Sequence, residues 1–330
     1  MTCPVSARQD DEHPHAAVLE RFERVGGSLF LGLFSVGLFD QPMLPPVSAA
    51  LEATGRIREQ PWARAIRTAA ADQLIYLGTD EERAAESRRL VELHRDVRGT
   101  APGGLRYSAL TPQNWNWILY STFFVQRGAY LAVTGDVPSP AADQAIWDRF
   151  RALAEGLQLP GRSRLIEDYQ ELVAYYDRTA VEELQQTATL AAATASVRRP
   201  PRPDFWPAVA APAWRLASPI ASRVVTVLGC GIMHPAVRAR MPVRWSPRHD
   251  VEFRLLTRML QVAFRVLPSV LTDTPLARNR RQYRKLVRRY QGVGLTSFAP
   301  DSAGQDADRR RHDHGVVQER QHAVEDHLGA

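Results

Sequence analysis

Residues 88–100 read RRLVELHRDVRGT, and the spacing of their apolar side chains decides how this chain is expected to fold. On a helix of 3.6 residues per turn, Leu90, Val91, His94 and Val97 lie on one face, while charged residues spread over the other faces. The stretch therefore predicts an amphipathic helix whose histidine points inward. A buried imidazole needs a partner for its ring nitrogens, and a backbone carbonyl, a carboxylate or a metal can each serve.

Helical periodicity of this kind continues through most of the chain. Thr79-Asp80 and Thr111-Pro112 are typical helix starts, because the threonine hydroxyl can accept a hydrogen bond from the first turn and proline is tolerated there. The one serious strand candidate is RVVTVLGC at residues 223–230, and no alternating pattern of useful length accompanies it. We therefore predict an all-α fold, built as a single large helical domain.

The composition is that of an ordinary globular protein. Of 330 residues, 45% are hydrophobic and 24% are charged, which suffices for a sizeable core. The formal net charge of +6 comes almost entirely from arginine, and we expect no nucleic-acid partner on this charge alone. The two cysteines, Cys3 and Cys230, cannot build a disulfide framework, so we expect a reducing, cytoplasmic location.

The two ends of the chain differ from its middle. Residues 1–15 and 296–330 are polar, and we expect both to be flexible, which leaves 16–295 as the helical domain. The most apolar early stretch, LFLGLFSVGLF at 29–39, is shorter than the ~20 residues that span a bilayer, so we expect a buried helix and no transmembrane segment. The basic stretch 276–292 could bind an anionic surface or nucleic acid, but a solvated helix is the more common outcome.

The stretch VVTVLGCGIMHP at 224–235 has the two glycines that begin a dinucleotide-binding fingerprint. Its third glycine position holds His234, proline follows, and no second strand or suitable acidic residue comes after it. We therefore favour a tightly packed helix end over a nucleotide site.

A second helix precedes the one that carries the histidine, and it has an unusual face. In PWARAIRTAAADQLIYLG at 61–78, the side chains of Arg64, Arg67 and Thr68 share one side of the helix. The LGTDEE turn then sends the chain back, so two antiparallel helices can place His94 at a pocket with this cationic, hydroxylated wall. Such a pocket suits a haem, with the imidazole on iron and the other groups directed at oxygen or the propionates. A hydrogen-bonded core histidine with surface arginines remains the plainer interpretation.

Several blocks of sequence, in order, resemble one known family. They are RxxRT at 64–68, LGTDEE, RRLVELHRDVRG, GGLRYSAL, WNWILYSTFF, and GCGIMHPAVRARMPVRWSPRHDVEFRLL at 229–256. This pattern resembles the MpaB-type oxygenase family, which includes the rubber oxygenase (latex-clearing protein) catalytic domain. The resemblance extends over roughly residues 20–290.

The resemblance implies an all-helical fold with a globin-like core, a b-type haem between helices, and His94 as the proximal ligand of the iron. Arg64, Arg67 and Thr68 match the distal, catalytic positions of the latex-clearing branch, and Arg64 and Thr68 would also contact the cofactor. Arg67 stands where that branch has a lysine. A guanidinium keeps its proton and does not readily ligate iron, so an open or water-bound distal side is expected. Glu52 is not convincingly placed as the acidic residue of that branch.

The function expected from this resemblance is a haem b-dependent oxygenase or oxidase that uses O2 on a small hydrophobic or natural-product substrate. Two other functions remain open. The same residues would serve a haem-binding or small-molecule-binding protein that senses or stores its ligand without turnover. A basic helical protein that binds nucleic acid, with His94 as a core residue, is the third.

Overall fold

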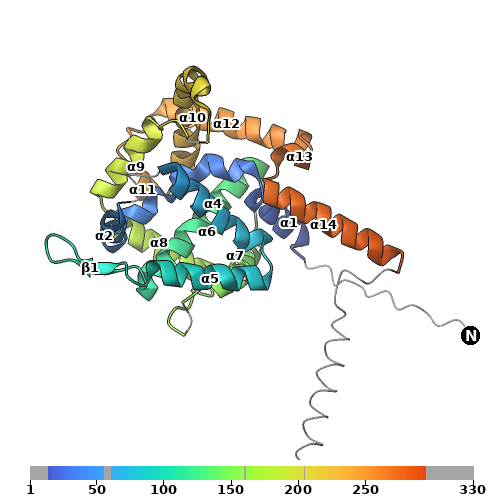
Figure 1. Cartoon of the computed structure of the whole chain (residues 1–330), viewed down its shortest axis with the longest axis horizontal. Helices are drawn as coiled ribbons and strands as arrows, with labels where there is room; N and C mark the ends of the chain where they lie inside the picture. Colours follow the sequence, from blue (N-terminus) through green and yellow to red (C-terminus); the bar gives the residue numbers. More distant parts are fainter. Residues whose placement is uncertain (1–13, 56–60, 160, 204, 295–330) are drawn as a thin grey trace, which may run out of the picture. The chain divides into compact units, whose positions relative to one another are not determined.

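The computed structural model describes residues 14–55, 61–159, 161–203 and 205–294, apart from the side chains of residues 61, 63 and 64. Over these residues the chain is mostly helical, which confirms the predicted class (Figure 1). Residues 223–230, the strand candidate, are helical as well. The prediction of a purely helical chain is wrong in one place, where two three-residue strands form an antiparallel hairpin.

The elements follow one another in this order, with 3-10 helices labelled η: α1 (Ala16–Gly26), η1 (Leu29–Met43), α2 (Pro45–Thr54), α4 (Pro61–Leu77), α5 (Asp80–His94), β1 (Arg98–Thr100), β2 (Arg106–Ser108), α6 (Pro112–Thr134), α7 (Pro140–Ala154), η2 (Glu155–Leu157), α8 (Tyr169–Glu182), α9 (Ala188–Arg198), η3 (Ala208–Ala210), α10 (Ala211–Ile232), α11 (Pro235–Arg240), α12 (Pro247–Val266), α13 (Ser269–Thr272) and α14 (Pro275–Gly292).

The chain divides into two compact units, Met1–Ala277 and Arg278–Ala330. The first unit holds the helices from α1 to α13 and the start of α14, and the described part of the second is the rest of α14. The predicted tail 296–330 and nearly all of the predicted flexible segment 1–15 lie outside the described residues. The domain limits of 16–295 therefore stay a prediction.

The hairpin follows directly after α5 and pairs Arg98 with Ser108, Gly99 with Tyr107, and Thr100 with Arg106. Its loop depends on glycine, because Gly103 and Gly104 have φ angles of +91° and +85°, which other residues rarely adopt. The paired residues are mostly exposed, so no buried alternation marks these strands in the sequence.

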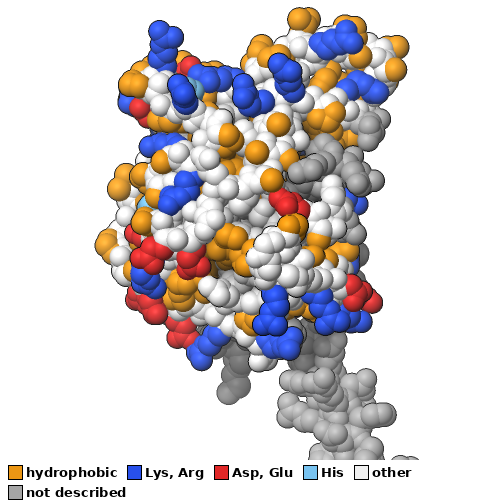
Figure 2. Space-filling view, turned by 90° about the vertical axis from the view of Figure 1, so that its left-hand side faces the viewer, with side chains coloured by type: hydrophobic (Ala, Val, Ile, Leu, Met, Phe, Trp, Pro, Cys, Tyr) orange, Lys and Arg blue, Asp and Glu red, His pale blue; other side chains and the backbone are white. Residues whose placement is uncertain are grey.

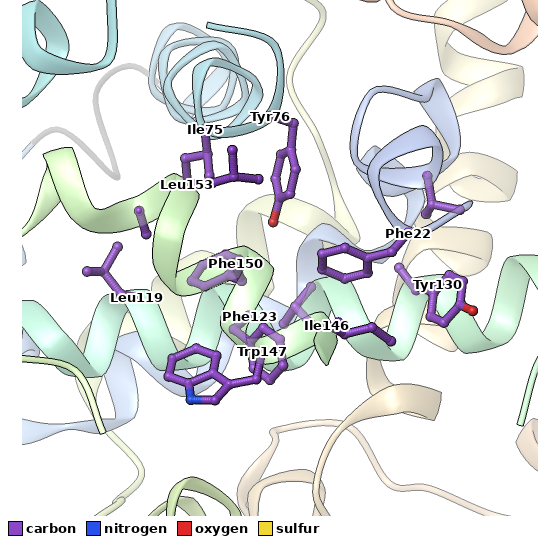
Figure 3. Close-up of a cluster of buried hydrophobic side chains, with 14 of the residues drawn as sticks. Phe22, Ile75, Tyr76, Leu119, Phe123, Tyr130, Ile146, Trp147, Phe150 and Leu153 are labelled. Carbon is purple, nitrogen blue, oxygen red and sulfur yellow. The ribbon is translucent and has the colours of Figure 1, made fainter. Parts of the chain in front are cut away.

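The core of the first unit forms around α6, whose side chains are buried on several sides. Phe123 of α6 meets Trp147 and Phe150 of α7 with ring centroids 4.7 and 5.3 Å apart (Figure 3). Tyr76 at the end of α4 lies against the same cluster, with its ring centroid 6.4 Å from that of Phe150. The C-terminal end of α4 therefore packs against the core.

The apolar stretch expected to be a buried helix is η1, a 3-10 helix rather than an α-helix. A 3-10 helix has three residues per turn, so residues three apart lie on one face. Phe34, Gly37, Asp40 and Met43 follow this spacing and are all buried. In an α-helix these four residues would lie on different sides of the helix. Their burial at every third position therefore fits 3-10 winding.

The glycines of the GCG sequence lie at the end of α10, where the helix packs closely against its neighbours. A Cβ atom on Gly229 would lie 2.6 Å from Cβ of Val36 and 2.8 Å from the backbone nitrogen of Gly37. A Cβ on Gly231 would overlap the ring of Phe253. The interpretation as a tightly packed helix end is confirmed by these contacts.

We expect Gly229→Ala to lower the free energy of unfolding by about 1–3 kcal/mol, because η1 must move to admit one methyl group. The gain of ~1 kcal/mol in helix propensity opposes this loss without cancelling the backbone clash. Gly32→Ala is the matched control, since no atom lies within 4 Å of its added Cβ. Urea denaturation measures both variants, and a Gly229→Ala protein as stable as the wild type would contradict the expectation.

Candidate functional site

A cavity of about 310 Å³ lies between α2, α4, α5 and α6, and most of the side chains around it are apolar. Its volume is at the lower end of the range of about 300–1,000 Å³ found for small-molecule sites. Ile75 of α4 and Leu119 of α6 belong both to the cavity wall and to the core cluster (Figure 3). The cavity floor is therefore part of the rigid interior.

The turn between α4 and α5 fixes how the two helices meet at the cavity. Gly78 is required there, because a Cβ would lie 2.5 Å from the carbonyl oxygen of Leu74. The Thr79 backbone N–H donates to Glu82 Oε2 at 2.8 Å, and the Glu82 N–H donates to Thr79 Oγ1 at 3.2 Å, which forms a capping box. Arg83 Nη1 donates to the Gly78 carbonyl at 2.7 Å. These contacts set the start of α5 and so the position of its far end.

His94 is the last residue of α5, and its partly buried ring lines the cavity. Its Nδ1 lies 2.7 Å from the carbonyl oxygen of Leu90. Since a carbonyl can only accept, Nδ1 carries a proton, and in the neutral ring the lone pair is then on Nε2. Trp115 meets the imidazole edge-on, with centroids 5.6 Å apart, and its indole N–H donates to the Leu157 carbonyl at 2.8 Å. The ring is thus held in one tautomer and one orientation.

The structure brings three of the four predicted site residues to this cavity. Arg67 and Thr68, from the predicted face of α4, line it together with His94. The side chain of Arg64 lies outside the described residues. The catalytic and cofactor-binding roles assigned to these four residues remain predictions.

A second arginine, Arg89, also lines the cavity, although the sequence analysis placed it on the charged side of its helix. Its Nε and Nη2 donate to the two carboxylate oxygens of Glu86 at 2.7 and 2.5 Å. The cavity therefore has a cationic group from each helix of the hairpin, Arg67 from α4 and Arg89 from α5.

Asp72 is a cavity residue that the sequence analysis missed. It follows Thr68 by four residues, which is the spacing of neighbours on one helix face, so continuing the face by one turn would have found it. Its half-buried carboxyl has no side-chain hydrogen bond to any residue in the described part of the chain. Burial raises the pKa of Asp72 to about 7. Glu52, the acidic residue considered from the sequence, is exposed and accepts a hydrogen bond from Thr189.

We expect Asp72→Asn to stabilise the protein at pH 8 more than at pH 5. A carboxyl whose folded pKa is about 7, against about 4 in the unfolded chain, favours the protonated folded state. Its stabilising contribution is present below about pH 4 and is lost as the pH rises to about 7. Thermal unfolding of wild type and variant between pH 5 and 8 checks this. Glu92→Gln, which removes an exposed carboxylate of α5, is the control and should show no such widening difference.

A buried carboxyl joins three elements beside the cavity. Asp40 of η1 accepts hydrogen bonds from Ser121 Oγ at 2.5 Å and from the Tyr176 hydroxyl at 2.6 Å. Burial raises the pKa of Asp40 to about 6, although both hydrogen bonds act in the opposite direction. The next residue, Gln41, lines the cavity, and its Nε2 lies 3.4 Å from Thr122 Oγ1. Asp40 thus helps to hold the η1 wall against α6 and α8.

No group of three or more His, Cys, Asp or Glu side chains that could hold a metal ion occurs within the part of the chain that the structure describes. A metal at this cavity would therefore need ligands that the described side chains do not supply together. A porphyrin provides four nitrogen ligands of its own and needs one axial residue from the protein.

Comparisons with known proteins place the chain in a family. The uncharacterised proteins Mb2261 of Mycobacterium bovis and Rv2237 of Mycobacterium tuberculosis are each 28% identical to it over 225 residues, which cover 65% of this chain and 79% of each relative. No solved structure matches the chain at a comparable level of significance. Residues 21–262 match the model of the ER-bound oxygenase mpaB/B'/rubber oxygenase catalytic domain, and the chain therefore belongs to this oxygenase family.

Proposed function

We propose that this protein is a haem b-dependent oxygenase that acts with O2 on a small hydrophobic substrate, with His94 as the proximal ligand of the iron. Membership of an oxygenase family supports O2 as co-substrate. The observation that carries the haem is the bond between His94 Nδ1 and the Leu90 carbonyl at the wall of an apolar cavity. Axial histidines commonly have this arrangement, because the second hydrogen bond orients the ring and raises its basicity.

The residues of the cavity fit a haem in three respects. One imidazole lines the cavity with its Nδ1 held by a backbone carbonyl, the lining is largely apolar, and Arg67 offers positive charge for a propionate. When bound, the haem would supply the redox-active iron at which O2 chemistry occurs. A globin-like core and the haem itself are part of this proposal.

The chain's own residues would then bind and orient the reactants. Arg67 keeps its proton and acts as a hydrogen-bond donor rather than as an iron ligand. The Thr68 hydroxyl can donate or accept, and Arg64 belongs to the same proposed set. Asp72, with a pKa of about 7, can take up or release a proton at neutral pH next to Thr68. The apolar lining, which includes Val47, suits a hydrophobic substrate and excludes water from it.

The proposal includes a cytoplasmic location and no nucleic-acid partner. The buried thiol of Cys230 is free, which suits a reducing compartment.

Two measurements on the purified full chain test the function. The protein is expressed with added iron and a porphyrin precursor, and its haem and iron contents are determined with its absorption spectrum. Oxygen consumption is then followed with a panel of hydrophobic substrates. A colourless, iron-free protein would contradict the haem. A haem protein whose oxygen uptake no substrate stimulates would favour a binding or sensing protein.

A further inference from the structure

The outer face of α12 is apolar although it is exposed. Val251, Leu255, Met259, Val262 and Val266 follow one another at spacings of four, four, three and four residues, so they form one stripe along the helix. Between 56% and 73% of each of these residues is exposed. We call these five residues the α12 stripe. An apolar stripe of this kind ordinarily faces the core of a protein.

The other face of the same helix already fills that role. Phe264 is buried, and Phe253, Leu256 and Leu260 pack against the core cluster. Helix α12 is therefore apolar on two faces, one inward and one outward. Folding of this unit accounts for the inward face only, which leaves the α12 stripe to be explained by something outside the unit.

Exposed apolar residues continue on the neighbouring elements. Helix α13 carries Val270 and Leu271, which are 54% and 61% exposed. The first half of α10 carries Leu216 and Ile220, which are 78% and 69% exposed. Helices α10 and α12 contact each other, and the Arg223–Glu252 ion pair joins them at 2.8 Å. Both helices lie at the upper end of the view in Figure 1.

The same region is strongly positive. Residues 205–272 contain nine arginines, no lysine and two carboxylates, a formal charge of +7. Arg254, Arg258 and Arg265 are exposed on α12 itself, beside the stripe. In Figure 2 blue and orange side chains predominate at the upper end of the visible face, and most red ones lie lower. A face that combines apolar and cationic groups matches the chemistry of an anionic phospholipid surface.

Helix α10 indicates that the protein would bind at the membrane surface and would not span the bilayer. Residues Ala208–Ile232 are long and apolar enough to span a bilayer by length and composition, with 22% of the most apolar window buried. The end of this segment is part of the protein interior, because Val227, Leu228 and Cys230 are fully buried. Helix α10 itself begins at Ala211, so 16 of its residues precede Val227, fewer than the ~20 residues of a span.

We propose that the α12 stripe, with the exposed ends of α10 and α13, docks this protein on an anionic phospholipid membrane. The apolar side chains enter the interface between headgroups and acyl chains, and Arg254, Arg258 and Arg265 contact the phosphates. Arginine is suited to this position because its aliphatic stem lies along apolar surface while its guanidinium reaches polar groups.

The test is co-sedimentation of the purified full chain with vesicles. Vesicles of phosphatidylcholine with about a third phosphatidylglycerol should bind the wild type at least tenfold more tightly than pure phosphatidylcholine vesicles do. The double variant Leu255→Glu/Met259→Glu should lose this binding at least tenfold. Both side chains are 60% exposed, so the fold should not depend on them. Arg254→Gln/Arg258→Gln should weaken binding to the anionic vesicles and leave the weak binding to neutral vesicles unchanged.

Leu105→Glu/Val181→Glu is the matched control, because it adds the same charge at exposed residues of the β1–β2 loop and of α8, which are not part of the proposed face, and it should bind like the wild type. Equal binding of the wild type and of the Leu255→Glu/Met259→Glu variant would overturn the proposal. So would a wild type that ignores vesicles but is a dimer by light scattering and becomes monomeric in that variant, since a second copy would then cover the stripe. Binding to DNA without binding to vesicles would overturn it as well.

Discussion

His94→Ala is expected to purify without haem, with its Soret absorbance lost and its iron content reduced at least tenfold. The reason is the geometry of the α5 end, where the Leu90 carbonyl fixes the proton on Nδ1 and Trp115 holds the ring at the cavity wall. Among the described residues that line the cavity, His94 is the one histidine. Absorption spectroscopy and iron analysis of the purified variant measure the effect.

Two further proteins separate loss of a ligand from loss of structure. His249→Ala removes an imidazole outside the cavity, where it bonds Ser246 at the start of α12, and it should keep its haem. His94→Gly leaves room for free imidazole, and added imidazole should restore the Soret band to that variant. If His94→Ala retains full haem occupancy, the proximal ligand is a different residue and the proposed site is wrong.

Phe150→Ala is expected to lower the free energy of unfolding by about 3–5 kcal/mol, which is the usual cost of removing a fully buried phenyl ring. The Phe150 ring is fully buried and packs against Phe123, Trp147 and Tyr76. Tyr76 stands at the end of α4, so the cavity left by this substitution lies behind the helix that carries Arg67 and Thr68. We therefore expect haem affinity to fall together with stability.

Phe205→Ala makes the same chemical change at a side chain that is 64% exposed, and it should alter the free energy of unfolding by less than about 0.5 kcal/mol. Urea denaturation of the two variants gives the comparison. A Phe150→Ala protein within 1 kcal/mol of the wild type would mean that the aromatic cluster does not set the stability of this unit.

The helical class followed from the sequence because apolar residues recur every three or four positions over long stretches. The β1–β2 hairpin after α5 was not predicted, because each of its strands has three residues and their side chains are mostly exposed. Helix η1 was expected only as a buried helix, because an almost uniformly apolar stretch has no periodicity from which to tell α-helical from 3-10 winding. Its burial at every third residue depends on what η1 packs against.

Helical periodicity also allowed part of the candidate site to be predicted from the sequence. Helical spacing placed Arg67, Thr68 and His94 on faces that the short turn at Gly78 brings to one cavity. Asp72 and Arg89 were missed, because charged residues are ordinarily assigned to solvent-facing sides. The depth of the cavity, and hence the pKa of Asp72, depends on where neighbouring helices end. A helical wheel of one segment holds no information about its neighbours.

The contact of Asp40 with Ser121 and Tyr176 has a consequence for how relatives of this protein diverge. A leucine at position 40 alone would orphan two buried hydroxyls, and a phenylalanine at position 176 alone would leave the carboxylate with one side-chain donor. Each single change is costly, whereas an apolar trio is tolerable. In an alignment of homologues, these three columns should therefore covary, with the acid present wherever the tyrosine is and absent wherever it is not.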